Sequence, residues 1–252
     1  TPSTEILESL ATFPATDVHA QWSTNEKVAL DVAIGASFAG ARALAAMKHV
    51  GLNVAADSLM SQTYIGVNGG LVIVVADDPG IHSSQNEQDT RFYGQFAQVP
   101  VLEPSDAQEA LEFTRLAFDL SERFDTPVIV RTTTRLSHTR STVELGARRE
   151  VAVRGFVDDR TKNVMIPVNA RPRHVALIER ERRLAEFLRD SPLNRIEMRD
   201  PALGIITAGT CYPYVREVLP TASVLKLGAS WPLAGDLLRE FCASVERVVV
   251  VE

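Results

Sequence analysis

Apolar runs that alternate with helical patterns constrain the fold of this chain more than any other feature. The runs at residues 71–76 and 248–251 contain no polar side chain. A strand is apolar along its whole length only where both faces of its sheet are covered, and helices between parallel strands give that cover. We therefore predict an α/β fold built on parallel sheets.

Turn residues divide the chain into alternating strands and helices. Strands are predicted at 18–22, 52–56, 71–76, 99–102 and 127–131. Helices are predicted at 6–13, from about 25 to 50, and at 106–124, the last with Ser105 as its N-cap. Further along, strands at 203–207, 224–227 and 248–251 alternate with helices at 171–189, 212–219 and 233–244.

A stretch without clear periodicity separates two predicted domains. Residues 137–169 are rich in charge, Thr and Gly, which is typical of a linker. We predict a first domain over 1–145, a linker over 146–170 and a smaller α/β domain over 171–252. Because the chain begins without Met and ends within an apolar strand pattern, we expect it to be part of something longer.

Charge, hydropathy and cysteine spacing argue against several functions. The net charge is −6 and basic residues are scattered, so we predict no nucleic-acid or membrane partner. No apolar run approaches the roughly 20 residues of a membrane span, and the first residues carry no signal peptide pattern, so we expect a cytoplasmic protein. Cys211 and Cys242 have no CxxC spacing, and we predict neither a zinc site, an iron–sulfur cluster nor other metal ligands in this chain.

One glutamate stands at the start of a helix rich in small residues. Glu26 follows Asn25, and Ala, Gly and Ser recur through residues 33–41. The simplest role for Glu26 is that of a first-turn acid, which interacts favourably with the helix dipole. The small residues favour a second interpretation, a binding site, because they permit close approach of another element or a ligand.

Three motifs in combination resemble one enzyme family. They are Asn25-Glu26-Lys27-Val28-Ala29, the segment 47–54 (MKHVGLNV) and the segment 76–89 (ADDPGIHSSQNEQD). Together they are similar to the pyrimidine-binding domain of the indolepyruvate branch of the 2-oxoacid:ferredoxin oxidoreductases, which use thiamine diphosphate. The resemblance covers essentially the whole chain, and residues 171–252 resemble a smaller transketolase C-terminal-like α/β domain.

The resemblance implies roles for particular residues. Glu26 is the implied catalytic residue, because a carboxylate at its position bonds N1′ of the aminopyrimidine and activates the cofactor for attack on a 2-oxo acid. Asn25 and Asp78 are the other implied cofactor-binding residues. The implied substrate-binding residues are Thr1, Ser3, His82, Ser83 and Arg91.

The residues themselves leave alternatives open in the loop after 71–76. Asp77 and Asp78 follow a strand, at the carboxyl end where α/β folds place ligands. Adjacent aspartates also form turns that cap a following helix, and we predict no metal from this pair. A lone histidine in a loop is more often a surface or hydrogen-bonding residue than a catalyst. For His82 the resemblance gives the two roles about equal weight. For His49 and Asn53 we predict structural roles.

One position departs from the pyruvate-using relatives of the family. They carry an arginine for the substrate carboxylate where this chain has Gly94. Two alternatives are open for that role: Arg91 takes it over, or the carboxylate is held in another way. The glycine is expected to leave room for an aromatic ring beside Phe92 and Tyr93, which favours an arylpyruvate over pyruvate as the substrate.

The resemblance also implies parts that this sequence does not contain. No Gly-Asp-Gly segment, which holds the diphosphate and Mg²⁺ in such enzymes, occurs in the chain. We expect that segment, and the 4Fe-4S clusters, in the remaining C-terminal domains of an α subunit or in a β subunit. Ferredoxin, coenzyme A and an arylpyruvate are the other implied partners, and a dimer of protomers is the implied assembly.

The predicted function is therefore part of an oxidoreductase that converts indolepyruvate and other arylpyruvates to acyl-CoA, with ferredoxin as the electron acceptor. In this interpretation the chain supplies the activating glutamate. Two alternatives remain open: a component of a non-oxidative thiamine diphosphate decarboxylase or synthase, and a non-catalytic assembly domain.

Overall fold

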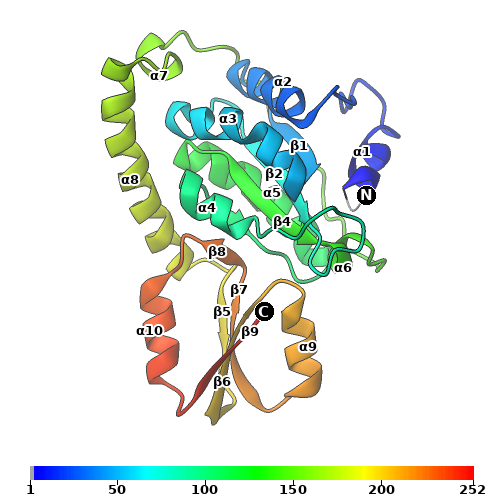
Figure 1. Cartoon of the computed structure of the whole chain (residues 1–252), viewed down its shortest axis with the longest axis vertical. Helices are drawn as coiled ribbons and strands as arrows, with labels where there is room; N and C mark the ends of the chain where they lie inside the picture. Colours follow the sequence, from blue (N-terminus) through cyan, green and yellow to red (C-terminus); the bar gives the residue numbers. More distant parts are fainter. Residues whose placement is uncertain (1–2) are drawn as a thin grey trace.

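The computed structural model describes residues 3–252, which form two sheets that share one hydrophobic core (Figure 1). The first sheet has the order β1 (Ala43–Lys48), β2 (Leu71–Asp77), β4 (Val128–Thr133), β3 (Val101–Leu102) and β8 (Ala229–Trp231). Its first four strands are parallel, and β8 pairs antiparallel with β3. Every residue of β2 is buried, as expected of an apolar strand covered on both faces.

Helices cover both faces of this sheet. α2 (Glu26–Phe38) and α3 (His49–Ile65) pack on the face that carries alternate residues such as Leu71 and Ile73. α5 (Ala107–Phe124) packs on the face that carries Val72 and Val74. The shorter helices of this half are α1 (Thr4–Leu10), α4 (Arg91–Ala97) and α6 (Thr134–Ser137).

The second sheet is smaller and also mostly parallel. Its order is β5 (Arg195–Glu197), β7 (Ala222–Leu227), β6 (Asp200–Ala208) and β9 (Val248–Val251), with only β5 antiparallel to its neighbour. α9 (Cys211–Val218) and α10 (Gly235–Ala243) accompany it. The predicted α/β fold class with parallel sheets is confirmed.

The predicted linker contacts the C-terminal end of α5. Residues 139–159 form neither helix nor strand, and α7 (Arg160–Asn163) and α8 (Pro167–Arg189) follow them. Arg154 donates to Glu122 at 2.7 Å, and Lys162 Nζ lies 2.7 Å from the Asp125 carboxylate. The division of the chain at residues 145, 170 and 171 stays a prediction.

Three predicted elements in the first 60 residues are wrong. Residues 18–22 form no strand, and 52–56 lie inside α3. The predicted helix over 25–50 is two elements, because α2 ends at Phe38, Gly40 has a φ of +87° and β1 follows. The alanine-rich β1 forms a strand because it pairs with β2, so tertiary contacts override the helical preference of alanine.

The remaining predicted elements are present, with shifted ends. The helix after Ser105 begins at Ala107, and Asp106 rather than Ser105 is its N-cap. Five short elements, β5, β8, α4, α6 and α7, were not predicted, because each is too short for its periodicity to be recognised. None of the helices between residues 3 and 252 is long and apolar enough to cross a membrane.

A buried ion pair joins the two sheets. Lys226 of β7 is fully buried, and its Nζ atom lies 2.5 Å from Oε2 of Glu109 on α5. The hydroxyl of Ser105 donates to the same oxygen at 2.7 Å, and the Lys226 ammonium lies 4.8 Å from the ring centroid of Phe113. Burial lowers the pKa of Lys226 despite the neighbouring carboxylate.

We predict that Lys226→Ala lowers the free energy of unfolding by about 3 kcal/mol, the lower end of the range for a broken buried pair. Glu109 loses the buried ammonium and keeps only the partly exposed Arg195, whose Nη1 atom lies 3.2 Å from Oε1. The matched control is Lys27→Ala, which removes an exposed ammonium that lies 2.7 Å from Asp57 and should change stability little. Denaturant unfolding of both variants tests this prediction. Equal losses of unfolding free energy in the two variants would show that the buried pair stabilises the protein no more than the exposed pair does.

Candidate functional site

The carboxyl edge of β1 brings two helix N-termini together. Both α2 and α3 run antiparallel to β1, so each begins at the same edge of the sheet. Glu26 is the first residue of α2, and Asn25 is its N-cap, whose side chain accepts a hydrogen bond from the Val28 amide at 3.0 Å. Asn25 therefore fixes the start of the helix that carries Glu26.

The Glu26 side chain lies across the first turn of α3. An ideal Cβ atom placed on Gly51, the third residue of α3, would stand 2.5 Å from Glu26 Cγ and 2.9 Å from Oε1. Glu26 is partly exposed, so its carboxylate is within reach of another molecule. Two positive helix ends attract that carboxylate, its own and that of α3.

Exposed apolar side chains lie on the three helices α2, α3 and α4. Val28 and Val32 on α2 and Val54 on α3 are 39%, 44% and 51% exposed. Phe92 and Phe96, one helical turn apart on α4, are 70% and 77% exposed. Large exposed apolar side chains on neighbouring elements are typical of a binding or assembly face.

Asp78 organises the loop after β2. It is fully buried, and its carboxylate accepts hydrogen bonds from the His82 amide at 3.1 Å, the Ser83 amide at 2.7 Å and the Thr134 hydroxyl at 2.7 Å. Burial by itself raises the pKa of Asp78, but these hydrogen bonds outweigh burial and hold the pKa well below its usual range. Asp78 thus acts on the loop, and no helix cap forms there.

The loop that Asp78 holds presents two of the predicted residues. His82 and Ser83 are both exposed. Lys48, the N-cap residue of α3, donates from Nζ to the Ser83 carbonyl at 3.0 Å. The buried His49 ring contacts the Asn86 carbonyl at 3.2 Å. These contacts place the loop beside the N-terminus of α3, and so on the same side as Glu26.

Asp77 points to a different cluster. Its carboxylate lies 2.6 Å from Nε of Arg131 on β4, and Arg131 also contacts Glu103 at 2.5 Å. Thr90 donates its amide to Asp77 at 2.9 Å. Asp77 and Glu103 are both buried, so the pair of carboxylates is neutralised in part by one guanidinium.

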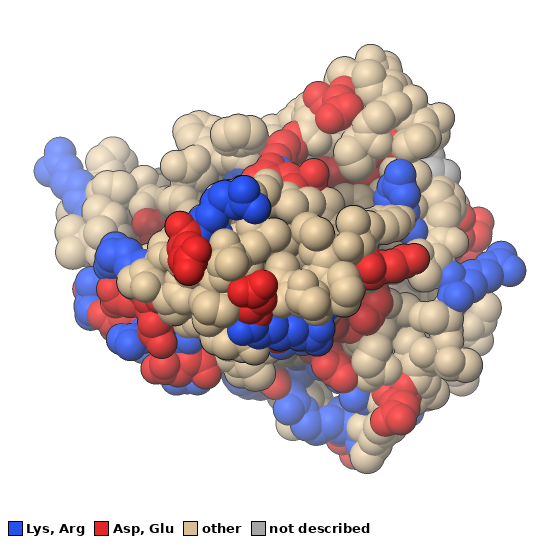
Figure 2. All heavy atoms as spheres, turned by 90° about the horizontal axis from the view of Figure 1, so that it is seen from below, with Lys and Arg blue, Asp and Glu red and all other residues tan. Residues whose placement is uncertain are grey.

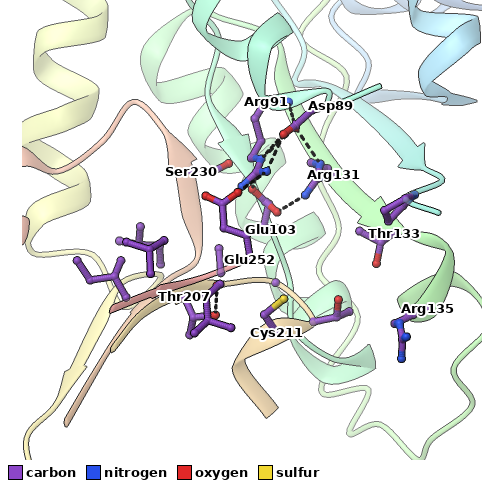
Figure 3. A pocket seen from close by; sticks show the side chains of 18 of the residues that line it. Asp89, Arg91, Glu103, Arg131, Thr133, Arg135, Thr207, Cys211, Ser230 and Glu252 are labelled. Atoms are coloured by element: carbon purple, nitrogen blue, oxygen red, sulfur yellow. Dashed lines mark hydrogen bonds and ion pairs between the residues drawn. The ribbon is translucent and has the colours of Figure 1, made fainter. Parts of the chain in front are cut away.

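Arg91 belongs to this second cluster. Its guanidinium forms a two-pronged contact with Asp89, at 2.9 Å and 2.6 Å, and it reaches Glu252 at 3.1 Å (Figure 3). The hydrogen bonds with Asp89 raise the pKa of Arg91. Its Nε and Nη2 atoms already donate to carboxylates of the same chain, so the structure does not present it as a free carboxylate-binding residue.

The prediction that Gly94 leaves room for an aromatic ring is wrong. A Cβ atom on Gly94 would stand 2.2 Å from Val101 Cγ2 and 3.3 Å from the Val99 carbonyl oxygen. The glycine is needed because α4 packs closely on the strand segment beneath it. Phe92 points to solvent, and Tyr93 donates its hydroxyl to Asn53 at 2.6 Å.

A cavity of about 980 Å³ lies where the carboxyl edges of the two sheets face each other. Arg131 and Thr133 from β4 line one side, and Thr207 from β6 lines the other (Figure 3). Arg91 and Asp89 belong to this cavity, whereas Glu26, His82 and Ser83 are not among its lining residues. The structure therefore divides the predicted site residues between two places.

The remaining predicted site residues lie at the N-terminal end of the chain. Ser3 is the N-cap residue of α1 and forms no side-chain cap hydrogen bond, while Thr1 lies outside the described residues. Within residues 3–252 no group of three or more His, Cys, Asp or Glu side chains could hold a metal ion. Acidic and basic side chains are interspersed on the face that Figure 2 shows.

Solved structures establish the kind of fold. A chain of 2-oxoglutarate:ferredoxin oxidoreductase from Magnetococcus marinus matches 99% of this chain and 53% of its own, with a TM-score of 0.77 and 18% identity. A split-gene transketolase, described as an inactive β4 tetramer, matches 90% of this chain and 62% of its own, with a TM-score of 0.58 and 17% identity. The likeness shows that the chain has the α/β fold of these two enzymes.

Sequence comparison then gives the family. The family model "Pyruvate flavodoxin/ferredoxin oxidoreductase, thiamine diP-binding" matches residues 1–182, and the chain belongs to this thiamine diphosphate-binding family. Indolepyruvate oxidoreductase subunits IorA from Pyrococcus abyssi and Archaeoglobus fulgidus are 47% and 44% identical across the whole chain. The chain spans about two fifths of their length, 41% and 42%. The resemblance predicted from the motifs is confirmed.

Two contributions to the site were missed by sequence reasoning. Gly51 was quoted in a motif, but nothing in the sequence shows that it faces Glu26. Arg131 was placed at the end of a strand, and its pairing with Asp77 and Glu103 depends on which strands are neighbours. The only sequence signal for the second was an arginine at the carboxyl end of an apolar strand, where ligand sites gather.

We predict that Asp78→Asn lowers the Tm by about 3–10 °C near neutral pH, because an amide cannot accept all the hydrogen bonds that the loop donates. The folded pKa lies below the ordinary value of 3.8. The stabilisation is therefore complete above that value and is lost as the pH falls towards the folded pKa. Thermal unfolding of both proteins at neutral and acidic pH should show the difference shrinking; a difference independent of pH would contradict the role of the ionised carboxylate.

Proposed function

We propose that this chain is the N-terminal part of a thiamine diphosphate-dependent enzyme that oxidatively decarboxylates indolepyruvate and other arylpyruvates to acyl-CoA, with ferredoxin as the electron acceptor. The observation that carries the proposal is the position of Glu26. It is a partly exposed carboxylate at the junction of two helix N-termini, in a chain of the thiamine diphosphate-binding family. The names of the relatives support the substrate class.

The residues around Glu26 fit an aminopyrimidine. The ring needs one carboxylate at its N1′ edge and apolar contacts on its faces. Glu26 offers the first, and exposed side chains on α2, α3 and α4, among them Val28, Val54 and Phe92, offer apolar surface. Because this surface is open, a second domain has to close the site and exclude water.

Each residue of the chain then has a limited task. When bound, thiamine diphosphate supplies the carbon nucleophile that attacks the 2-oxo acid. Glu26 holds a proton at N1′, and Asn25 keeps the helix start in place. Asp78 keeps the loop beside α3 in position, so that His82 and Ser83 face the substrate side. Thr1, Ser3 and Arg91 are further proposed substrate-binding residues. For Arg91 this role requires that its guanidinium leaves Asp89 when the substrate binds.

The missing parts of the site follow from the same proposal. The diphosphate, Mg²⁺ and 4Fe-4S clusters would be held by the remaining domains of the α subunit or by a β subunit, and coenzyme A and ferredoxin would bind to the complete enzyme. We also propose the domain division at 1–145, 146–170 and 171–252 and a dimer of protomers. The relatives' greater length leaves room for such domains.

The proposal predicts that Glu26→Gln in the complete enzyme lowers turnover by at least 10²–10⁴-fold, the range expected for loss of a positioned acid–base group. Anaerobic, coenzyme A-dependent dye reduction with indolepyruvate and with pyruvate measures it. The wild type should prefer indolepyruvate, and the variant should keep its Tm.

Asp236→Asn is the matched control, because Asp236 is a first-turn acid of α10 with an exposed side chain and its loss should leave turnover unchanged. Near-normal turnover in Glu26→Gln would rule out the role of Glu26. If the wild type reduces no dye with any 2-oxo acid, the oxidoreductase assignment fails, and a decarboxylase component or an assembly domain takes its place.

A further inference from the structure

We propose that Gly51 is a positioning residue for the reaction: its missing side chain provides the space in which the Glu26 side chain lies across α3. This inference rests on the proposed function of Glu26 and goes beyond it, because it assigns the orientation of the carboxylate to a residue on another helix. The motif that contains Gly51 gave no hint of this task, since the residue lies 25 positions further along the chain.

The space at Gly51 is already filled by Glu26. An ideal Cβ atom at this position would meet Glu26 Cγ at 2.5 Å, Oε1 at 2.9 Å and Cδ at 3.0 Å. The three heavy atoms nearest to this Cβ position all belong to Glu26. Distances below about 3 Å do not occur between non-bonded carbon atoms at rest, because optimal contact lies at about 3.5–4.0 Å. Any side chain at position 51 therefore displaces the Glu26 side chain.

Backbone conformation does not explain this glycine. Gly51 lies in the first turn of α3 and is not among the glycines with positive φ. Alanine is the better helix former by about 0.8–1.0 kcal/mol. A glycine that costs helix stability and has ordinary helical geometry is explained by the space that it leaves free, and Glu26 occupies that space.

The two helices cannot easily slide apart to relieve such a clash. The Ser58 hydroxyl of α3 donates to the Asp31 carboxylate of α2 at 2.6 Å. This contact and the contact between Glu26 and Gly51 follow the same order along α2 and α3, so the two helices lie side by side and point the same way. The buried side chain of Leu30 also holds α2 against its neighbours. With the helices fixed, the flexible Glu26 side chain is the part that moves.

The positive N-terminal end of α3 attracts the Glu26 carboxylate. This helix has no side-chain cap hydrogen bond at its N-cap, Lys48, and no acid in its first turn. Its first amide N–H groups and its positive end therefore lack a partner from the helix itself. Gly51 lets the Glu26 side chain come close to that positive end, which favours the carboxylate in this orientation.

We test this with Gly51→Ala in the complete enzyme. A displacement of about 1 Å at a reacting group costs on the order of 100-fold in rate. We expect kcat to fall by about that factor, with the KM for indolepyruvate and the Kd for thiamine diphosphate changed by no more than a few-fold. The Tm should not fall, because the Glu26 side chain can rotate away. The double variant Glu26→Gln/Gly51→Ala should be no slower than Glu26→Gln alone.

Gly35→Ala is the matched control. Gly35 lies in α2, also has helical geometry, and a Cβ atom there would have nothing within 4 Å. It should raise stability and leave kcat unchanged. If Gly51→Ala keeps its kcat, or loses Tm in proportion to activity, or slows the Glu26→Gln variant further, the positioning role is wrong. If Glu26→Gln itself is fully active, the failure lies in the proposed function instead.

Discussion

The antiparallel packing of α2 and α3 against β1 is the constraint on which the candidate site depends. Because both helices return antiparallel to the same strand, their N-termini meet at one edge of the sheet. That meeting places Glu26 over Gly51 and puts the Asp78-held loop beside Lys48. A carboxylate, two positive helix ends and a polar loop are thus brought together by topology before any ligand is present.

The second sheet is coupled to the first by contacts that are costly to break. β8 pairs with β3, and Lys226 of β7 is buried against Glu109 of α5. The core cluster runs from Val72 and Val74 through Phe113 to Leu225 and Phe241, so one hydrophobic layer serves both sheets. The cavity between their carboxyl edges, where Arg131 and Arg91 pair with acids, therefore belongs to the contact region between the two sheets. Glu26 is not among its lining residues.

Sequence reasoning predicted the parts of this molecule that depend on local pattern. The apolar run of β2, the helix that follows Ser105 and the fold class needed no knowledge of neighbours. It failed at β1, where pairing overrides the helical preference of an alanine-rich segment, and at residues 52–56, where five residues are too few to tell a strand from a buried helix. The relation of Gly51 to Glu26, the packing of Gly94 on Val101 and the pairing of Arg91 are contacts between distant segments, which no single-chain pattern contains.

The most direct test of the central claim is a structure of the complete enzyme with thiamine diphosphate bound. The account predicts that a Glu26 carboxylate oxygen lies within about 2.6–3.2 Å of the aminopyrimidine N1′ atom, with the Glu26 side chain still lying across Gly51. An aminopyrimidine bound in the cavity between the sheets, or a Glu26 side chain turned away from both the ring and α3, would contradict it.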